Sequence, residues 1–147
     1  SRQSRGLGDV YKRQELGKQL ALKVENIMHP INDVAQINNK DSISSCAKKM
    51  TDNPLGAALL LENGSLKGIV TEGDLRKSIA SNLDLSNSIE PFINDNPISI
   101  HSSVSILDAM KIMEDRSSKI SCLPVVDSDG KCLGLLTIHD LYQTKLV

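Results

Sequence analysis

The chain has 147 residues, a formal net charge of −1, 24% charged and 39% hydrophobic residues, a composition that leaves room for one compact domain or two small ones. Its basic residues are scattered and aromatic residues make up only 2%, which excludes a phosphate-binding stripe and a base-stacking platform for nucleic acid. The longest uncharged apolar run, 55–61, is far shorter than the roughly 20 residues that cross a bilayer, and no signal sequence opens the chain. We therefore expect a cytoplasmic protein with no nucleic-acid or membrane partner.

The two N-terminal segments differ sharply in pattern. Residues 1–14 (SRQSRGLGDVYKRQ) are basic and show neither helical nor strand periodicity, so we expect a non-native or disordered tail there. A patterned segment begins at Glu15, and residues 15–26 are expected to form a linker helix. The fold is therefore sought downstream of this linker.

A first structural unit is predicted over residues 27–82. It opens with a short strand at 34–37, followed by an amphipathic helix that Asp41 or Ser42 caps. The apolar face of this helix, at helical spacing, comprises Ile43, Cys46, Ala47 and Met50. Two apolar strands, 57–62 and 66–71, then flank Asn63-Gly64, a pair that supplies the positive φ angles of a tight hairpin. A short helix over 72–80 closes the unit.

Residues 97–147 repeat this order of elements after a linker at 83–96. A strand near 98–100 precedes a helix whose apolar face comprises Ile106, Ala109, Met110 and Met113. Strands 122–126 and 132–137 follow, joined by the turn residues 127–130, and a last helix begins near Ile138. Each unit therefore reads β-α-β-β-α.

The two units are an internal duplication. At an offset of 63 the first helices align, and at an offset of 66 Gly68, Thr71 and Asp74 match Gly134, Thr137 and Asp140. A unit of about 60 residues has a thin core and leaves one sheet face poorly covered, so the units are expected to pack sheet against sheet with pseudo-two-fold symmetry. Such packing predicts an α/β (α+β) fold with two related clefts between the units.

The strongest chemical signal is the pattern G-h-h-T-x-x-D-L, where h is hydrophobic, which occurs at 68–75 and again at 134–141. A buried strand ends at Thr71 or Thr137 and a helix begins, so free backbone N–H groups point out of the sheet edge and favour an anion such as phosphate. Asp74 and Asp140 are placed to accept hydrogen bonds from a ribose diol. The alternative is that each Thr-x-x-Asp is only a capping box, and the sequence leaves both interpretations open.

Two more side chains near these motifs are candidates. Arg76, one turn further along the first helix, is a candidate phosphate contact, although a solvated surface arginine fits the sequence as well. His139 lies where a ligand would pass and is equally compatible with a polar position in the first turn of the helix. We expect no catalytic group and no metal site, because the histidines lack cysteine or carboxylate partners at ligand spacing. Reduced core thiols are expected for three residues, Cys46, Cys122 and Cys132.

The duplicated motifs, GIVTEGDLRK and GLLTIHDLYQ, together with the order of elements, resemble tandem CBS (cystathionine β-synthase-type) domains. The resemblance spans Val24 to about Thr144. It implies that Thr71, Asp74, Thr137 and Asp140 contact the phosphate and ribose of a nucleotide in the cleft between the repeats, with Arg76 and His139 nearby. An adenosine or cytidine nucleotide is then the expected allosteric ligand, with no cofactor otherwise.

A second resemblance concerns residues 15–29, ELGKQLALKVENIMH, which are similar to the segment that joins the sugar isomerase (SIS) domain to the CBS pair in D-arabinose 5-phosphate isomerases. It departs just upstream, where Tyr11 to Gln14 stand in place of a His-Pro-Gly-type run. It implies a parent enzyme that interconverts ribulose 5-phosphate and arabinose 5-phosphate for octulosonate and lipopolysaccharide synthesis. The SIS domain is expected to be absent from this chain, which is then not itself an enzyme.

Three functions compete. In the first, the pair is a regulatory sensor that binds a nucleotide or nucleotide-sugar and acts on its own SIS domain. In the second, it is an assembly module that forms homo-oligomers and binds no ligand, and the two threonines serve only as helix caps. In the third, it regulates another partner such as a transporter or dehydrogenase, which the segment at 16–29 disfavours.

Overall fold

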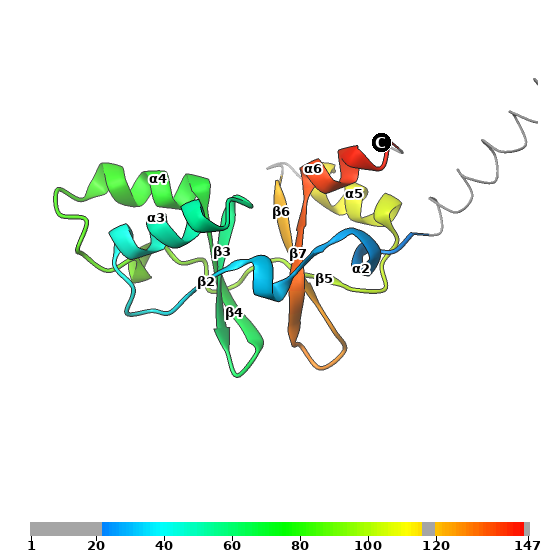
Figure 1. Cartoon of the computed structure of the whole chain (residues 1–147), viewed down its shortest axis with the longest axis horizontal. Coiled ribbons are helices and arrows are strands. Elements are labelled where there is room, and N and C mark those ends of the chain that lie inside the picture. The colour runs from blue at the N-terminus through cyan, green and yellow to red at the C-terminus, as the bar shows by residue number, and fades with distance from the viewer. Residues whose placement is uncertain (1–21, 116–119, 146–147) are drawn as a thin grey trace, which may run out of the picture.

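The computed structural model describes residues 22–115 and 120–145, and it places two β-α-β-β-α units side by side (Figure 1). The first unit consists of β2 (Ala35–Ile37), α3 (Ile43–Asp52), β3 (Ala57–Glu62), β4 (Ser65–Thr71) and α4 (Glu72–Ser81). The second consists of β5 (Ile100–His101), α5 (Ile106–Glu114), β6 (Cys122–Val126), β7 (Cys132–Thr137) and α6 (Ile138–Gln143). The predicted element order is confirmed. The predicted tail at 1–14 and residues 15–21 of the predicted linker helix lie outside the described residues.

Short polar side chains start the first helix of each unit. The Ser42 hydroxyl accepts a hydrogen bond from the Ser45 N–H at 3.0 Å, and the Ser105 hydroxyl accepts one from the Asp108 N–H at 3.1 Å. These bonds satisfy backbone donors that the first helical turn leaves without an internal partner. The helices therefore begin at Ile43 and Ile106, and their apolar faces turn toward the sheets.

The hairpins form as their turn residues predict. Asn63 and Gly64 have φ angles of 52° and 82°, the left-handed conformation that a two-residue hairpin turn needs. Gly130, at φ 81°, provides the same freedom in the longer turn of the second hairpin. Each hairpin then pairs antiparallel, with Ala58 opposite Val70 in the first and Leu123 opposite Leu136 in the second.

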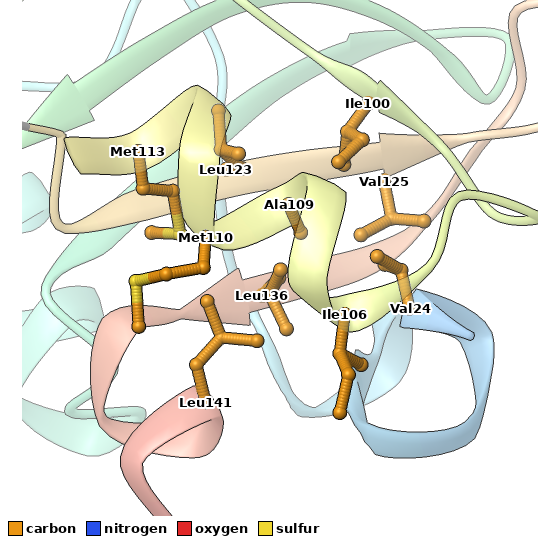
Figure 2. Close-up of a cluster of buried hydrophobic side chains, with 10 residues drawn as sticks. All are labelled: Val24, Ile100, Ile106, Ala109, Met110, Met113, Leu123, Val125, Leu136 and Leu141. Carbon is orange, nitrogen blue, oxygen red and sulfur yellow. The ribbon is translucent and has the colours of Figure 1, made fainter. Parts of the chain in front are cut away.

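Among the described residues, buried side chains form three clusters. In each unit one cluster lies between the helices and the sheet; the cluster of the second unit is shown in Figure 2. The third cluster lies between the units: the sheets contribute Ala57, Leu59, Ile69, Cys122, Cys132 and Leu135, and the residue just before β2 contributes Val34. The predicted sheet-to-sheet packing is thereby confirmed.

The chain crosses between the units in a way that the sequence did not reveal. From residue 22 the described chain first runs along the second unit, where β1 (His29–Pro30) pairs antiparallel with β7, giving a sheet of order β1-β7-β6-β5. Val24, in α2 (Val24–Ile27), is buried in the core of that unit (Figure 2). The chain then passes through η1 (Ile31–Asp33) to β2 in the other sheet, of order β2-β3-β4. Residues 22–30 therefore pack on the second unit, and the predicted boundary at residue 27 falls within them.

The start of the second unit differs slightly from its prediction. β5 begins at Ile100, where pairing with Val125 of β6 starts, whereas the predicted strand began at Ile98. Ile98 follows Pro97, which has no N–H group to donate to a neighbouring strand, and its side chain is 41% exposed. Ile98 is thus left at the surface.

Gly134 permits the close approach of β1. A Cβ atom at this position would lie 2.1 Å from the carbonyl oxygen of His29, and 3.1 Å from the sulfur of Met28. We expect Gly134→Ala to lower the free energy of unfolding by about 1–3 kcal/mol, because the crowding atom is backbone and relief requires β1 to move. Urea denaturation monitored by circular dichroism measures the change.

Gly73→Ala is the matched control for this substitution. A Cβ atom at Gly73 would meet its nearest neighbour, the Thr71 hydroxyl, at 3.8 Å, which is an ordinary contact. Alanine there should raise the free energy of unfolding by about 0.4–1 kcal/mol, because it lowers the conformational entropy of the unfolded chain. Equal stabilities for the two variants would show that β1 does not pack closely on β7.

Candidate functional site

The start of α4 is a complete capping box. The backbone N–H and the hydroxyl of Thr71 both donate to Oδ2 of Asp74 at 3.0 Å, and the hydroxyl accepts from the Asp74 N–H at 3.4 Å. The other carboxylate oxygen, Oδ1, has no hydrogen-bond partner among residues 22–115 and 120–145. Capping therefore uses one oxygen of Asp74 and leaves the second available to a ligand donor.

The start of α6 repeats this geometry. The Thr137 N–H donates to Oδ2 of Asp140 at 2.9 Å, and the Thr137 hydroxyl accepts from the Asp140 N–H at 3.1 Å. Here Oδ1 is occupied, because Nε2 of His29 lies 2.9 Å away. The two motifs thus have the same local structure and differ in what reaches the second carboxylate oxygen.

A cavity of about 300 Å³ opens between the repeats beside the start of α4. The first repeat contributes Thr71 and Arg76 with their neighbours Gly56, Glu72 and Gly73; the second contributes Ile120, Ser121 and Cys122, where β6 begins. A smaller, more apolar cavity of about 140 Å³ shares Thr71, Ile120 and Cys122 and is also lined by Ile69, Asn94 and Ile98. The cleft thus has a polar end beside α4 and an apolar end.

The predicted site residues separate into two groups. Thr71 and Arg76 line the larger cavity, whereas Asp74 lines neither cavity and its carboxylate is turned back onto Thr71. Thr137, His139 and Asp140 lie on the other repeat and line neither cavity. His139 is exposed, with Nε2 3.1 Å from the Gln143 amide nitrogen one turn along α6. The structure therefore places the start of α4 on a cavity between the repeats, whereas Ile138 at the start of α6 lines a separate cavity of about 200 Å³ that the second repeat forms alone.

His29 is the residue that sequence reasoning missed. Its contact with Asp140 joins positions 111 apart along the chain, a relation without a local periodicity. The glycines of the two motifs carry a usable signal, because a glycine within a strand often marks the close approach of another backbone segment. Gly134 faces His29 in this way, and Gly68 faces Ile93 and Asn94.

The cysteine thiols are buried and hold their protons. Burial raises the pKa of Cys46 to about 11, with a further increase from the nearby charge of Asp41. Burial also raises the pKa of Cys122, whose thiol donates to the Leu55 carbonyl at 3.2 Å, and the pKa of Cys132. All three thiols are free. Cys122 therefore contributes an apolar wall to the cleft and not a nucleophile.

Residues 22–115 and 120–145 hold neither a metal-binding cluster nor a membrane-spanning helix. In that part of the chain no group of three or more His, Cys, Asp or Glu side chains is placed to hold a metal ion. Nor does any helix there have the length and apolar character that spanning a membrane requires.

The fold and the cleft together define a tandem-repeat module in which two β-α-β-β-α units face each other across a cavity. The sequence model described as CBS domain matches residues 24–81 and 89–145. These matches cover most of the chain, which belongs to the CBS domain family as a tandem pair. The fold class predicted from the duplicated motif is therefore confirmed.

Curated relatives include arabinose 5-phosphate isomerases from several bacteria. The chain is 36% identical over 132 residues to the KdsD enzyme of Francisella tularensis, and 36% identical over 130 residues to that of Pseudomonas aeruginosa. These alignments cover 89% and 87% of this chain but only 40% and 39% of the enzymes. The chain thus spans about two-fifths of the length of these relatives.

Solved CBS pairs share the fold. CBSX2, a CBS-pair protein from Arabidopsis thaliana solved in complex with AMP, has a TM-score of 0.69 and 21% identity, with 84% of this chain and 96% of that chain covered. A CBS domain pair solved with 5-methylthioadenosine and S-adenosyl-L-methionine has a TM-score of 0.73 and 24% identity, with 84% and 94% covered. At these identities the likeness establishes the fold.

The raised pKa of Cys46 predicts a pH dependence of stability. Because the folded protein raises the pKa from 9.0 to about 11, this thiol stabilises the fold fully below about pH 9. That contribution is lost as pH rises toward 11, because the unfolded chain ionises first. Guanidinium denaturation at a series of pH values should show a shallower loss of stability above pH 9 for Cys46→Ala than for the wild type.

Val70→Ala is the control for the cavity that Cys46→Ala leaves. Val70 is fully buried in the same cluster as Cys46 and has no ionisable group. The Val70 variant should lose stability at every pH but keep the steeper decline above pH 9. Parallel curves for the two variants would exclude Cys46 as the source of the pH dependence.

Proposed function

We propose that this CBS pair is a regulatory module that binds a nucleotide or nucleotide-sugar in the cleft beside α4. The carrying observation is the cavity of about 300 Å³ between the repeats, with Thr71 and Arg76 on its wall. Small-molecule sites in proteins begin at about this volume. The size therefore favours a compact ligand such as a nucleoside monophosphate.

The polar end of the cleft suits a phosphate and a ribose. Arg76 forms no hydrogen bond or ion pair with any residue in 22–115 or 120–145, so its guanidinium is available for a bidentate contact with a phosphate. The start of α4 adds the positive end of a ten-residue helix. Asp74 is hydrogen-bonded to Thr71 on the cavity wall and is not itself part of that wall, and its Oδ1 offers an acceptor for a ribose hydroxyl. One arginine suits a monophosphate better than a triphosphate.

The apolar end of the cleft suits a base. Ile69, Ile98 and Ile120 line it from three separate segments, together with Asn94. Aliphatic side chains can enclose a flat base where aromatic platforms are lacking, and burial of apolar surface contributes about 25 cal/mol per Å². In this arrangement Ile98, which precedes β5 and is partly exposed, serves as one wall of the pocket for the base.

The relatives support a wider proposal about the parent protein. KdsD enzymes are arabinose 5-phosphate isomerases, and this chain aligns with about 40% of their length. We take the CBS pair to regulate an attached sugar isomerase domain that interconverts ribulose 5-phosphate and arabinose 5-phosphate for octulosonate and lipopolysaccharide synthesis. A ligand regulates such a domain only if it binds two arrangements of the repeats with different affinity.

An assembly module is the second candidate function. Apolar side chains gather at the end of α4 and in the loop after it: Leu83 is fully exposed, while Ile79 and Leu85 are 43% and 40% exposed. Exposed large apolar side chains that lie close together often mark an interface. Under this alternative the pair forms homo-oligomers and the cleft binds nothing.

Arg76→Gln tests the nucleotide site. We expect the variant to bind AMP or CMP about tenfold more weakly than the wild type, because a charge-assisted contact to the phosphate is lost. Isothermal titration calorimetry at low ionic strength measures the dissociation constant. In thermal shift, wild-type protein at about 100 times that constant should gain about 2.7 kcal/mol.

Lys77→Gln is the matched control, since it removes the same charge from the adjacent position of α4, outside the cavity. Its dissociation constant should stay within about twofold of the wild-type value, because an exposed charge contributes little. Equal losses in both variants would point to a general effect of charge. If neither AMP nor CMP raises the melting temperature of a protein that unfolds cooperatively, the nucleotide proposal fails and the assembly function is favoured.

A further inference from the structure

The surroundings of the two capping boxes differ at a pair of equivalent positions. In the first repeat the linker crosses the edge of β4 at Asn94, which forms a bridge with Ile69. In the second repeat the incoming segment crosses the edge of β7 at His29, opposite Leu135. Ile69 and Leu135 correspond at the repeat offset of 66, so His29 and Asn94 occupy equivalent places beside the two capping boxes.

The two crossing residues direct their side chains differently. The Asn94 amide oxygen accepts from the N–H of Asn96 at 3.0 Å, within its own loop, and does not contact Asp74. The His29 ring reaches Oδ1 of Asp140 at 2.9 Å, and the carboxylate is only 14% exposed. Asp140 therefore has both oxygens engaged by this chain, Oδ2 by Thr137 and Oδ1 by His29.

We infer that the chain itself closes the start of α6 to a ligand: His29 occupies Oδ1 of Asp140, the oxygen that Asp74 leaves without a hydrogen bond, and fastens residues 22–30 to the second repeat. The chain then has one open cleft and one internal latch. The inference rests on the proposed function only for the ligand at Asp74, because the latch is a contact of the ligand-free chain.

The His29 contact helps to hold residues 22–30 on the second repeat, because β1 is short. A pairing of two residues is a weak attachment by itself, and the buried Val24 and the His29 contact add to it. The Val24 N–H also donates to the Val104 carbonyl at 2.8 Å. Any segment that precedes residue 22 is thereby connected to the second repeat, whereas Arg76 lies on the first. A ligand that changes the angle between the repeats therefore moves the attachment point relative to its own site.

Hydrogen exchange on the full 147-residue chain without ligand tests the latch directly. We expect His29→Ala to raise the exchange rates of the His29 and Leu135 amides about three- to tenfold, the range for a lost and partly exposed charge-assisted hydrogen bond. His101→Ala is the matched control, because His101 is hydrogen-bonded to Ser103 and Ser128 away from Asp140. Equal exchange in the two variants at these amides overturns the latch.

Calorimetric titration of the wild type with AMP tests whether the start of α6 is closed to a ligand. A stoichiometry of one per chain that Arg76→Gln weakens is the expected result, and a stoichiometry of two overturns the inference. If AMP does not bind at all, the proposed nucleotide function fails for this ligand, while the exchange rates still decide the latch. The two failures are therefore distinguishable.

Discussion

The inner faces of the two sheets bury each other, and the rest of the molecule depends on that contact. Each repeat alone has helices on one sheet face only, so Leu59, Ile69 and Leu135 would be left in water. Burial of side chains of this size contributes about 1.5–3 kcal/mol each. The same contact brings Cys122 and Ile120 of one repeat beside Thr71 and Arg76 of the other. Cleft and core are thus products of one packing event, and a change in the sheet-to-sheet contact alters both.

Local sequence signals were sufficient for nearly all of the secondary structure. Helical spacing predicted α3 and α5, and Asn63-Gly64 predicted a turn with two positive φ angles. Duplication then supplied the topology, because two copies of one small unit can cover both sheets only by facing each other. The Thr-x-x-Asp pattern likewise predicted the helix starts, where both capping boxes form. Whether these residues also bind a ligand stays a prediction.

The asymmetry between the two motifs was beyond sequence reasoning. The motifs are alike at Thr71, Asp74, Thr137 and Asp140, and they imply two equivalent sites. The difference arises in the segments that cross the sheet edges, which are irregular and carry no periodicity. His29 and Asp140 meet only because β1 joins the sheet of the second repeat. Contacts of this kind depend on the path of the chain between repeats.

The crossing of the chain also bears on where it can be divided. Because residues 22–30 complete the sheet of the second repeat, a cut in the linker between the repeats would give an N-terminal fragment that carries β1 and a C-terminal fragment that lacks it. Neither fragment would match a whole structural unit. Each would instead expose the surface that the other covers, which is the condition for reassociation of a split protein. The duplicated sequence units and the spatial units are therefore offset by one strand.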